Sequence, residues 1–400
     1  MTETGQLSRQ TASRNAWFAY VGAGVALTGV VLVTPSLPVM RDALGLSEAQ
    51  LALVISVYLL PAAVGAVPAG LLADRIGRRP VFGWALIGFG VAGGLLPFVG
   101  ESFRVFLGIR FFQGMMFAGL LPLTMTILGD VFRGADLVRA QGRRSVAMGL
   151  AGALLPAIGG LLVAGGWFIP WFVQATGVVL GIIVLFGLVD PPELATATSG
   201  RLEIGSLLRF FRSRAIVILE YAGFLRLFSK FAVITFLPVL LVDVRDRSPA
   251  FAGLVIGTAS IAGTLVALAS GRLARMGKAT SWIALGEVST GLAVLGMAAL
   301  PWAPAIFAAA VLYGAAEGLT GVFINSMVTA ATDAGQRASF VAATGAIRNF
   351  AKFLAPAAFG AATLFMPLVP AFLILATISV LSGGLAPMLA PIGARLAETA

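Results

Sequence analysis

Long apolar runs separated by short polar turns follow one another along the whole chain. Twelve of these runs reach about 20 residues, the length that an α-helix needs to cross the hydrocarbon core of a membrane. They lie near residues 17–40, 51–73, 80–100, 104–128, 145–165, 168–189, 216–240, 251–272, 281–300, 303–329, 339–362 and 365–388. The pattern predicts an all-α integral membrane protein with twelve transmembrane helices.

The polar turns contain basic residues that are distributed unevenly between the two sides of the membrane. If the N-terminus lies inside, the outer loops hold only Arg41, Arg104, Arg245 and Arg247, and nearly all other loop cations lie on the cytoplasmic side. Cytoplasmic loops of membrane proteins are enriched in lysine and arginine. We therefore expect a protein of the inner (cytoplasmic) membrane with both termini in the cytoplasm. The first 15 residues are polar, so we expect no cleaved signal peptide.

The two halves of the chain repeat one another at an offset of 200 residues. Leu37-Pro38-Val39 recurs as Leu237-Pro238-Val239, and Pro156 and Gly160 recur as Pro356 and Gly360. Parallel repeats of this kind are typical of secondary transporters, whose substrate sites lie near the membrane midplane. We predict two pseudo-symmetric six-helix bundles. The predicted parts are an N-terminal tail 1–15, bundles 16–189 and 215–390, a linker 190–214 and a C-terminal tail 391–400.

Composition excludes several classes of function. Charged residues make up 11% of the chain, against about 25% in soluble domains. The net charge of +10 lies mostly in loops that orient the chain in the bilayer, so we expect no nucleic-acid partner. The chain has no cysteine or histidine, and we find no metal-binding cluster and no phosphate-binding loop. We expect neither an enzyme nor a bound cofactor or metal, and proton chemistry near neutral pH then requires a carboxylate with a perturbed pKa.

The turn between the second and third runs carries the most specific motif. Its fixed positions are Gly70, Asp74, Arg75, Gly77, Arg78 and Arg79. Gly70 is expected to let two helices approach, and Gly77 permits a sharp reversal of the chain. Asp74 can pair with an arginine or lie at the N-terminus of a neighbouring helix. The second half has Ala274 in place of Asp74. We therefore expect a charged contact that holds the turn closed, here called the latch, to be complete only in the first half.

This motif resembles the loop 2–3 signature of the major facilitator superfamily, in which the twelve-helix drug:proton antiporters are most similar. Arg110-Phe-Phe-Gln113-Gly114 is similar to the buried-arginine motif of that family, and Asp130 and Arg139 follow in the next loop. The fifth run resembles its efflux motif, although Leu155 stands where a glycine usually precedes the proline. The motif positions here are Gly152, Pro156, Gly159 and Gly160. The resemblance implies conformational roles for these residues, but the first run lacks the acid that drug antiporters often carry.

Charged residues inside the apolar runs are the main candidates for chemistry, because each costs about 2.5–3.5 kcal/mol on insertion scales. The cations are Arg110, Arg226, Lys230, Arg348 and Lys352. The acids are Glu317, near the centre of its run, and Glu287, while Glu220 lies near the end of a run and is expected to reach the membrane surface. Arg110 can either donate to backbone carbonyls or tune a carboxylate, and the sequence leaves both open.

Four of these cations form two pairs with i, i+4 spacing, so each pair lies on one helical face. The predicted substrate-binding residues are Arg226, Lys230, Arg348, Lys352, Glu317, Asn325 and Gln113. The predicted proton-coupling residues are Glu317, Arg110 and Glu287. Alternatively, these charges neutralise one another or extend to the membrane surface. The aromatic residues that can line a pocket, or simply pack, are Tyr58, Tyr313, Phe231 and Trp171.

The predicted function is proton-coupled secondary transport, driven by the proton gradient. We expect a monomeric efflux antiporter for small organic or amphipathic molecules that works by alternating access in the lipid bilayer. The alternative is a dedicated organic-anion transporter, by uptake, exchange or export, that uses the four paired cations. Since paired cations in a low-dielectric site attract anions strongly, we expect anionic or neutral substrates to be preferred.

Overall fold

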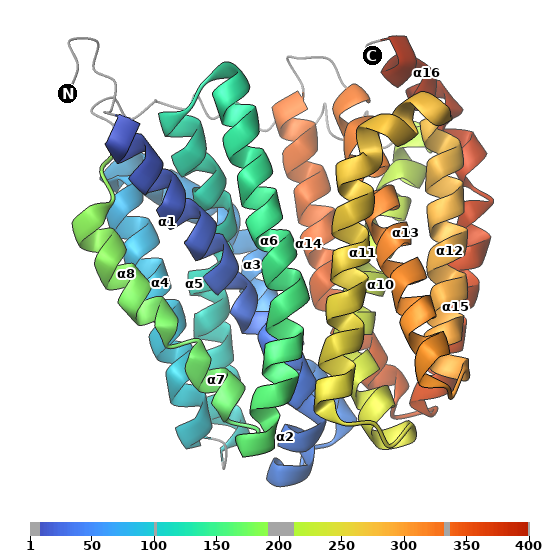
Figure 1. Cartoon of the computed structure of the whole chain (residues 1–400), viewed down its shortest axis with the longest axis horizontal. Coiled ribbons are helices and arrows are strands. Elements are labelled where there is room, and N and C mark those ends of the chain that lie inside the picture. Colours follow the sequence, from blue (N-terminus) through green and yellow to red (C-terminus); the bar gives the residue numbers. More distant parts are fainter. Residues whose placement is uncertain (1–8, 100–101, 191–211, 332–336, 399–400) are drawn as a thin grey trace. The chain divides into compact units, whose positions relative to one another are not determined.

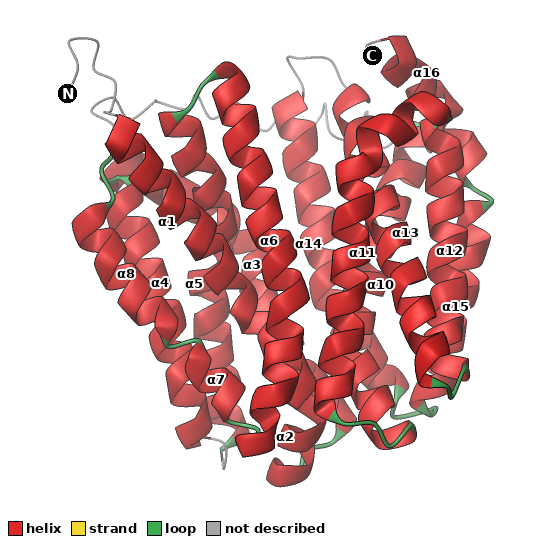
Figure 2. Ribbon diagram, viewed as in Figure 1, coloured by secondary structure: helices red, strands yellow, loops and turns green. Residues whose placement is uncertain are grey.

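The computed structural model describes residues 9–99, 102–190, 212–331 and 337–398, and in these residues all regular structure is helical (Figure 2). The first half contains α1 (Arg9–Leu27), α2 (Leu37–Leu44), α3 (Glu48–Ile76), α4 (Arg78–Leu95), α5 (Phe103–Val131), α6 (Gly134–Leu162), α7 (Ile169–Val173) and α8 (Thr176–Gly187). The second half contains α10 (Arg214–Val239), α11 (Pro249–Met276), α12 (Ala279–Ala299), α13 (Ala303–Ala330), α14 (Arg337–Ala362), α15 (Leu368–Gly383) and α16 (Ala390–Glu398) (Figure 1).

The helices follow the predicted apolar runs in position. In the described part of the chain, ten helical segments are long and apolar enough to cross a membrane, and α15 with α16, bent by 49°, counts as an eleventh. The remaining long helix, α14, has 26 residues and carries Arg348 and Lys352. The chain is therefore a multi-pass, all-helical membrane protein, as the sequence predicts.

Several predicted runs are not continuous α-helices, and the run 168–189 is divided into α7 and α8. After α1 the chain forms a π-helical turn (Thr28–Leu32) and a 3₁₀ turn (Thr34–Ser36) before α2, and α10 continues into a second π-helical turn (Leu240–Val244). Prolines stand next to both breaks, and a proline removes one backbone donor from the helix. The helices α1 and α16 cover residues 9–15 and most of 391–400, which were predicted as tails. Most of the predicted linker, 190–214, lies outside the described residues.

The chain divides into two compact units, unit 1 (Met1–Thr198 with Ser248–Gly253) and unit 2 (Ser199–Arg247 with Leu254–Ala400). The predicted limits of the two bundles stay a prediction. In unit 1, α5 packs against α1, α3 and α4, and α4 also packs against α8. In unit 2, α12 packs against α13 and α15, and α10 packs against α13 and α14.

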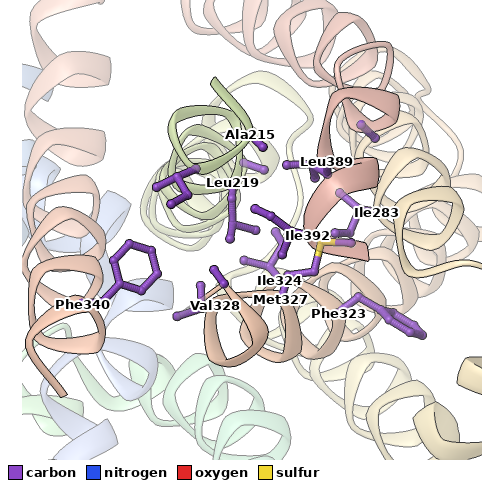
Figure 3. Packing of buried hydrophobic residues seen from close by; sticks show 14 of the residues in the cluster. Ala215, Leu219, Ile283, Phe323, Ile324, Met327, Val328, Phe340, Leu389 and Ile392 are labelled. Atoms are coloured by element: carbon purple, nitrogen blue, oxygen red, sulfur yellow. The ribbon is translucent and has the colours of Figure 1, made fainter. Parts of the chain in front are cut away.

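The core of unit 2 gathers apolar side chains from several helices at the end where α10 begins. Leu219 of α10, Met327 of α13, Phe340 of α14 and Leu389 after α15 are each fully buried (Figure 3). This apolar layer holds α10, α13 and α14 together, so that the charged residues farther along these helices have a fixed framework.

Candidate functional site

The basic turn of unit 1 is organised around Arg78, which is only 3% exposed. Its guanidinium forms ion pairs with Asp74 and with Asp130, both at 2.8 Å, and donates a hydrogen bond to the carbonyl of Ala73 at 3.0 Å. Of the two positions expected for Asp74, the described residues therefore favour pairing with an arginine. Arg139 pairs with Asp136 on the surface of α6 and not with Asp130.

A third aspartate completes the turn from a distant part of the sequence. The carboxylate of Asp190 accepts the backbone N–H groups of Arg78 and Arg79, both at 3.0 Å, and so caps the first turn of α4. Gly77 has φ of 102°, and a Cβ there would collide with the Asp190 carboxylate, so both its backbone angle and its lack of a side chain are needed. A Cβ on Gly70 would meet nothing within 4 Å, so the close helix approach expected there is absent from the described residues.

The efflux-like motif of the fifth run lies inside the continuous helix α6. Pro156, Gly159 and Gly160 are buried, and Gly152 is half-buried. A Cβ on Gly159 would collide with the carbonyl of Leu32, which belongs to the π-helical turn. Gly159 is therefore a place of close backbone approach within unit 1, which fits helix packing through small residues.

Arg110 lies at the centre of unit 1 and has no exposed surface. Its guanidinium donates to the carbonyls of Val54 and Gly29, at 2.9 and 3.2 Å, and to Oε1 of Gln113 at 2.6 Å. The rings of Tyr58 and Trp171 lie 4.1 and 5.1 Å from its guanidinium carbon. The described residues give it no carboxylate partner, so of its two predicted roles the geometry favours the donor to backbone carbonyls. Gln113 is fully buried in the same network and donates to the carbonyl of Phe89.

The charged cluster of unit 2 is centred on Glu317 of α13. Its Oε2 accepts hydrogen bonds from Nη2 of Arg226 and Nζ of Lys230, at 3.0 and 2.9 Å, and Nε of Arg226 lies 2.9 Å from Oε1. The Glu317 side chain is 11% exposed and that of Lys230 is 42% exposed. Arg226 and Lys230 thus share one carboxylate, which is the mutual neutralisation that the sequence left open as the alternative for these charges.

Two glycines make room for the arginines of this cluster. A Cβ on Gly321 of α13 would lie 2.6 Å from Nη2 of Arg226, and a Cβ on Gly223 of α10 would lie 3.0 Å from Nε of Arg348. Gly321 is one turn beyond Glu317, so the same helix supplies both the carboxylate and the space for its partner. Neither glycine was recognised from the sequence, although each stands within four residues of a candidate charge.

The second cation pair has neutral partners. Arg348 donates from Nη1 to Oδ1 of Asn325 at 2.6 Å, and Lys352 donates from Nζ to Oδ1 of Asn349 at 2.8 Å. Asn325, a predicted substrate contact, is exposed on α13 and holds this arginine. The mutual neutralisation considered for these charges therefore applies to Arg226 and Lys230, but these two contacts provide none for Arg348 and Lys352.

The other two acids of unit 2 are buried. Glu287 on α12 is 2% exposed, and its Oε1 has no hydrogen-bond partner among the described residues. Glu220 is 4% exposed, and its Oε1 accepts a hydrogen bond from Thr344 at 2.8 Å. The expectation that Glu220 reaches the membrane surface is wrong, because α10 begins at Arg214 and Glu220 already points into its packed side.

The predicted aromatic residues divide between the two units. Tyr58 and Trp171 are fully buried and pack on Arg110. Tyr313 is buried one turn before Glu317, and Phe231 is half-buried on α10. Packing therefore accounts for Tyr58 and Trp171.

Membrane-spanning helices with repeated halves and a cluster of ionisable side chains inside them define a membrane transporter. A family model described as Major Facilitator Superfamily matches residues 19–356, and the chain belongs to this family. The protein is therefore a transporter and not an enzyme, as the sequence predicts.

Known relatives and solved structures agree with this assignment. The chain is 31% identical over 153 residues to the bacillibactin exporter of Bacillus subtilis, a match that covers 37% of this chain and 38% of the exporter. It is 26% identical over 185 residues to the quinolone resistance protein NorA of Staphylococcus aureus, covering 46% and 47%. These matches span less than half the length of each relative. A bacterial homologue of the human lysosomal transporter Spinster superposes with a TM-score of 0.76 at 15% identity, covering 98% of this chain and 97% of that one, which shows the fold alone.

Proposed function

We propose that the protein is a proton-coupled efflux antiporter for small organic or amphipathic molecules that works by alternating access. The names of two relatives, an exporter and a drug-resistance protein, support export as the direction. The observation that carries the coupling proposal is the position of Glu317, inside α13 and in contact with two cations. Ionisable groups within membrane spans mark ion pathways in transporters.

Protonation of Glu317 removes the charge that Arg226 and Lys230 share. The neutral carboxyl then attracts the two cations less strongly, and this change of charge inside the span biases the balance between the inward-open and outward-open states. Antiport requires that proton and substrate bias this balance in opposite directions, a negative linkage that transport under a pH gradient measures. Glu287 is the second candidate for the proton carrier, because it is buried and acts electrostatically on the same cluster.

Reconstitution into proteoliposomes tests the coupling. With an imposed pH gradient, the unmodified protein should accumulate a quinolone against its concentration gradient, and Glu317→Gln should lose accumulation while retaining exchange of labelled for unlabelled compound. Asp136→Asn, which removes an exposed acid that pairs only with a neighbour on α6 among the described contacts, is the matched control. Continued accumulation by Glu317→Gln would contradict the assignment and direct attention to Glu287→Gln.

The proposed orientation has both termini in the cytoplasm, argued from the uneven distribution of loop arginines. Single cysteines can be introduced into this cysteine-free chain at Ser199 and at Ser248. An impermeant thiol reagent outside whole cells should label the cysteine at position 248 and spare that at position 199. The reverse labelling would contradict the orientation.

A dedicated organic-anion transporter is the second candidate function. The neutral partners of Arg348 and Lys352 favour it, because two cations without a contacting carboxylate suit an anionic cargo. Net accumulation distinguishes the two candidates. A proton antiporter accumulates substrate against its concentration gradient only when a pH gradient is imposed, whereas a dedicated anion exchanger gains nothing from the pH gradient and accumulates substrate only against a gradient of a counter-anion.

A further inference from the structure

Arg348 and Lys352 differ from the other buried cations of unit 2 in the acceptors that they contact. Both lie on one face of α14, one turn apart, and each donates to the amide oxygen of an asparagine, Asn325 or Asn349. An amide oxygen fixes the position of a cation but does not neutralise it. The two side chains are therefore held in place with their charges uncompensated by these contacts.

The charges around this pair add to its positive potential. Those that act on Lys352 are Lys230, Arg226 and Arg348, all of them cations. Glu220 acts on Arg348 from α10, but its carboxylate and the guanidinium form no ion pair in the described residues. Glu317 is already shared by Arg226 and Lys230. Lys352 therefore lies among three other cations, and no acid is among the charges that act on it.

Arg348 also has two donors that are not used. Its Nε and Nη2 atoms are buried and have no hydrogen-bond partner within the described parts of the chain. These two N–H groups lie on one edge of the guanidinium and point in parallel, the geometry that binds a carboxylate, sulfonate or phosphate through two hydrogen bonds. A buried donor without an acceptor destabilises the protein, so an anion that reached this edge would remove that penalty.

The same face of unit 2 is unsuited to contact with lipid tails. Charged side chains at mid-membrane face a bundle interior or a water-filled path, since exposure to hydrocarbon is costly. Lys230, four residues after Arg226 on α10, keeps 42% of its side chain exposed. Arg226, Lys230, Arg348 and Lys352 are thus positioned where a solute, and not an acyl chain, meets the helix surface.

We propose that Arg348 and Lys352 bind the anionic group of an amphipathic organic anion, and that this anion is the preferred substrate. The proposal rests on the transport function proposed above and adds the charge of the substrate. To take two oxygens of the anion, the Nε–Nη2 edge of Arg348 has to turn away from Gly223 of α10, against which it is buried, and Lys352 supplies the second positive charge. Glu317 remains with Arg226 and Lys230 and is not displaced by the substrate.

Three probes that share one aromatic body and differ in charge test the proposal: naphthoate, naphthamide and trimethylnaphthylammonium. Binding is measured by equilibrium dialysis of the labelled probes against the full chain in phosphatidylcholine nanodiscs, without a pH gradient. Naphthoate should bind at least about tenfold more tightly than naphthamide, the gain expected from hydrogen bonds to charged groups. Tighter binding of the ammonium probe, or no binding of naphthoate, would overturn the proposal.

Variants then assign the preference to these residues. Arg348→Gln and Lys352→Gln should each weaken naphthoate at least about tenfold and change naphthamide by less than about threefold. Arg272→Gln removes an exposed cation of α11 and should change neither probe. Gly223→Ala retains every charge but displaces Arg348, and should weaken naphthoate alone, so the test does not depend on the charge variants folding well. Equal losses of affinity for both probes would refute a role for the two cations in distinguishing an anionic from a neutral substrate.

Two further arms separate the possible failures. Nanodiscs with and without phosphatidylglycerol distinguish a soluble anion from a lipid headgroup as the natural ligand, because only a headgroup site loses naphthoate binding when the anionic lipid is present. Naphthamide transport by the unmodified protein under a pH gradient tests the transport function independently. Transport of naphthamide without preferential naphthoate binding would refute the anion proposal and leave the transporter proposal standing.

Discussion

The two units treat their buried cations differently. In unit 1, Arg110 donates to two backbone carbonyls and a glutamine, and the buried Arg144 donates to Oγ1 of Thr124 and to a carbonyl of α5. In unit 2, Arg226 and Lys230 share the side chain of Glu317, and Arg348 contacts an asparagine. A cation bound to backbone groups cannot change partners without opening its helices, whereas side-chain partners can be exchanged. Apart from Arg78 in the basic turn, which pairs with Asp74 and Asp130, unit 1 therefore uses buried charge as framework, and unit 2 offers charge for chemistry.

The largest expected effect tests this difference with the same substitution in both units. Arg110→Lys should lower the free energy of unfolding by about 3–5 kcal/mol, because an ammonium cannot reproduce the flat fork that reaches Val54, Gly29 and Gln113. Arg226→Lys should cost about 1 kcal/mol or less, since a lysine can still pair with Glu317. Thermal unfolding in one detergent compares them. Equal losses at both positions would show that the units do not differ in this way.

A smaller loss of stability is expected when the shared acid is neutralised. Glu317→Gln should cost about 2 kcal/mol, below the roughly 3–5 kcal/mol for breaking a fully buried pair, because the amide oxygen still accepts hydrogen bonds. The loss should shrink when Lys230→Gln is added, since fewer cations are then left unpaired, and a double-mutant cycle measures that coupling. Additive losses would mean that Glu317 and Lys230 do not act as a pair.

The glycine beside Arg226 allows a finer test. Gly321→Ala should displace the guanidinium, destabilise the protein by about 1–2 kcal/mol and slow transport severalfold. Gly271→Ala on α11 meets nothing within 4 Å and should be neutral or stabilise by up to about 1 kcal/mol, because alanine favours a helix more than glycine does. Equal behaviour of the two variants would exclude a steric role for Gly321.

The smallest effect on stability concerns the basic turn of unit 1. Asp74→Asn removes one of two acids from Arg78 and should cost about 0.3–1 kcal/mol, because Asp130 remains and Asp74 is partly exposed. Turnover should fall and the balance should shift toward the inward-open state, with ligand affinity little changed. Ala274→Asp in the second copy of the turn is the control and should alter neither. Distances between spin labels on the helices, measured by pulsed electron-spin resonance, report the populations of the inward-open and outward-open states. Unchanged populations in Asp74→Asn would refute a role for Asp74 in holding the turn closed.

The helices could be predicted because their signal is local. An apolar run of about 20 residues ends where a polar turn begins, and the predicted run 303–329 corresponds to α13 at Ala303–Ala330. The breaks after α1 and α10 were not predicted, because prolines also occur inside the continuous helices α3, α5 and α6. Whether a proline breaks a helix depends on neighbours that can donate a hydrogen bond to the freed carbonyl, and these are not local.

The residues of the site were predicted better than the contacts between them. The i, i+4 spacing gives Arg226 and Lys230 a common face, but it does not say that Glu317 lies opposite. The sequence left two roles open for Arg110. Every residue has a backbone carbonyl, so the acceptors of this arginine cannot be identified from residue types. Asp190 was assigned to a linker, although it caps α4 over a separation of 112 residues. Such long-range partners follow from packing and cannot be read from a local pattern.

The cap from Asp190 has a consequence for how the protein is made. The amides of Arg78 and Arg79 leave the ribosome long before their acceptor, which is synthesised 112 residues after Arg78. At translation rates of about 5–20 residues per second, the interval is roughly 6–22 s. Throughout that time the start of α4 lacks its carboxylate. The basic turn can therefore be completed only after α8, the last helix of the first half, has been synthesised.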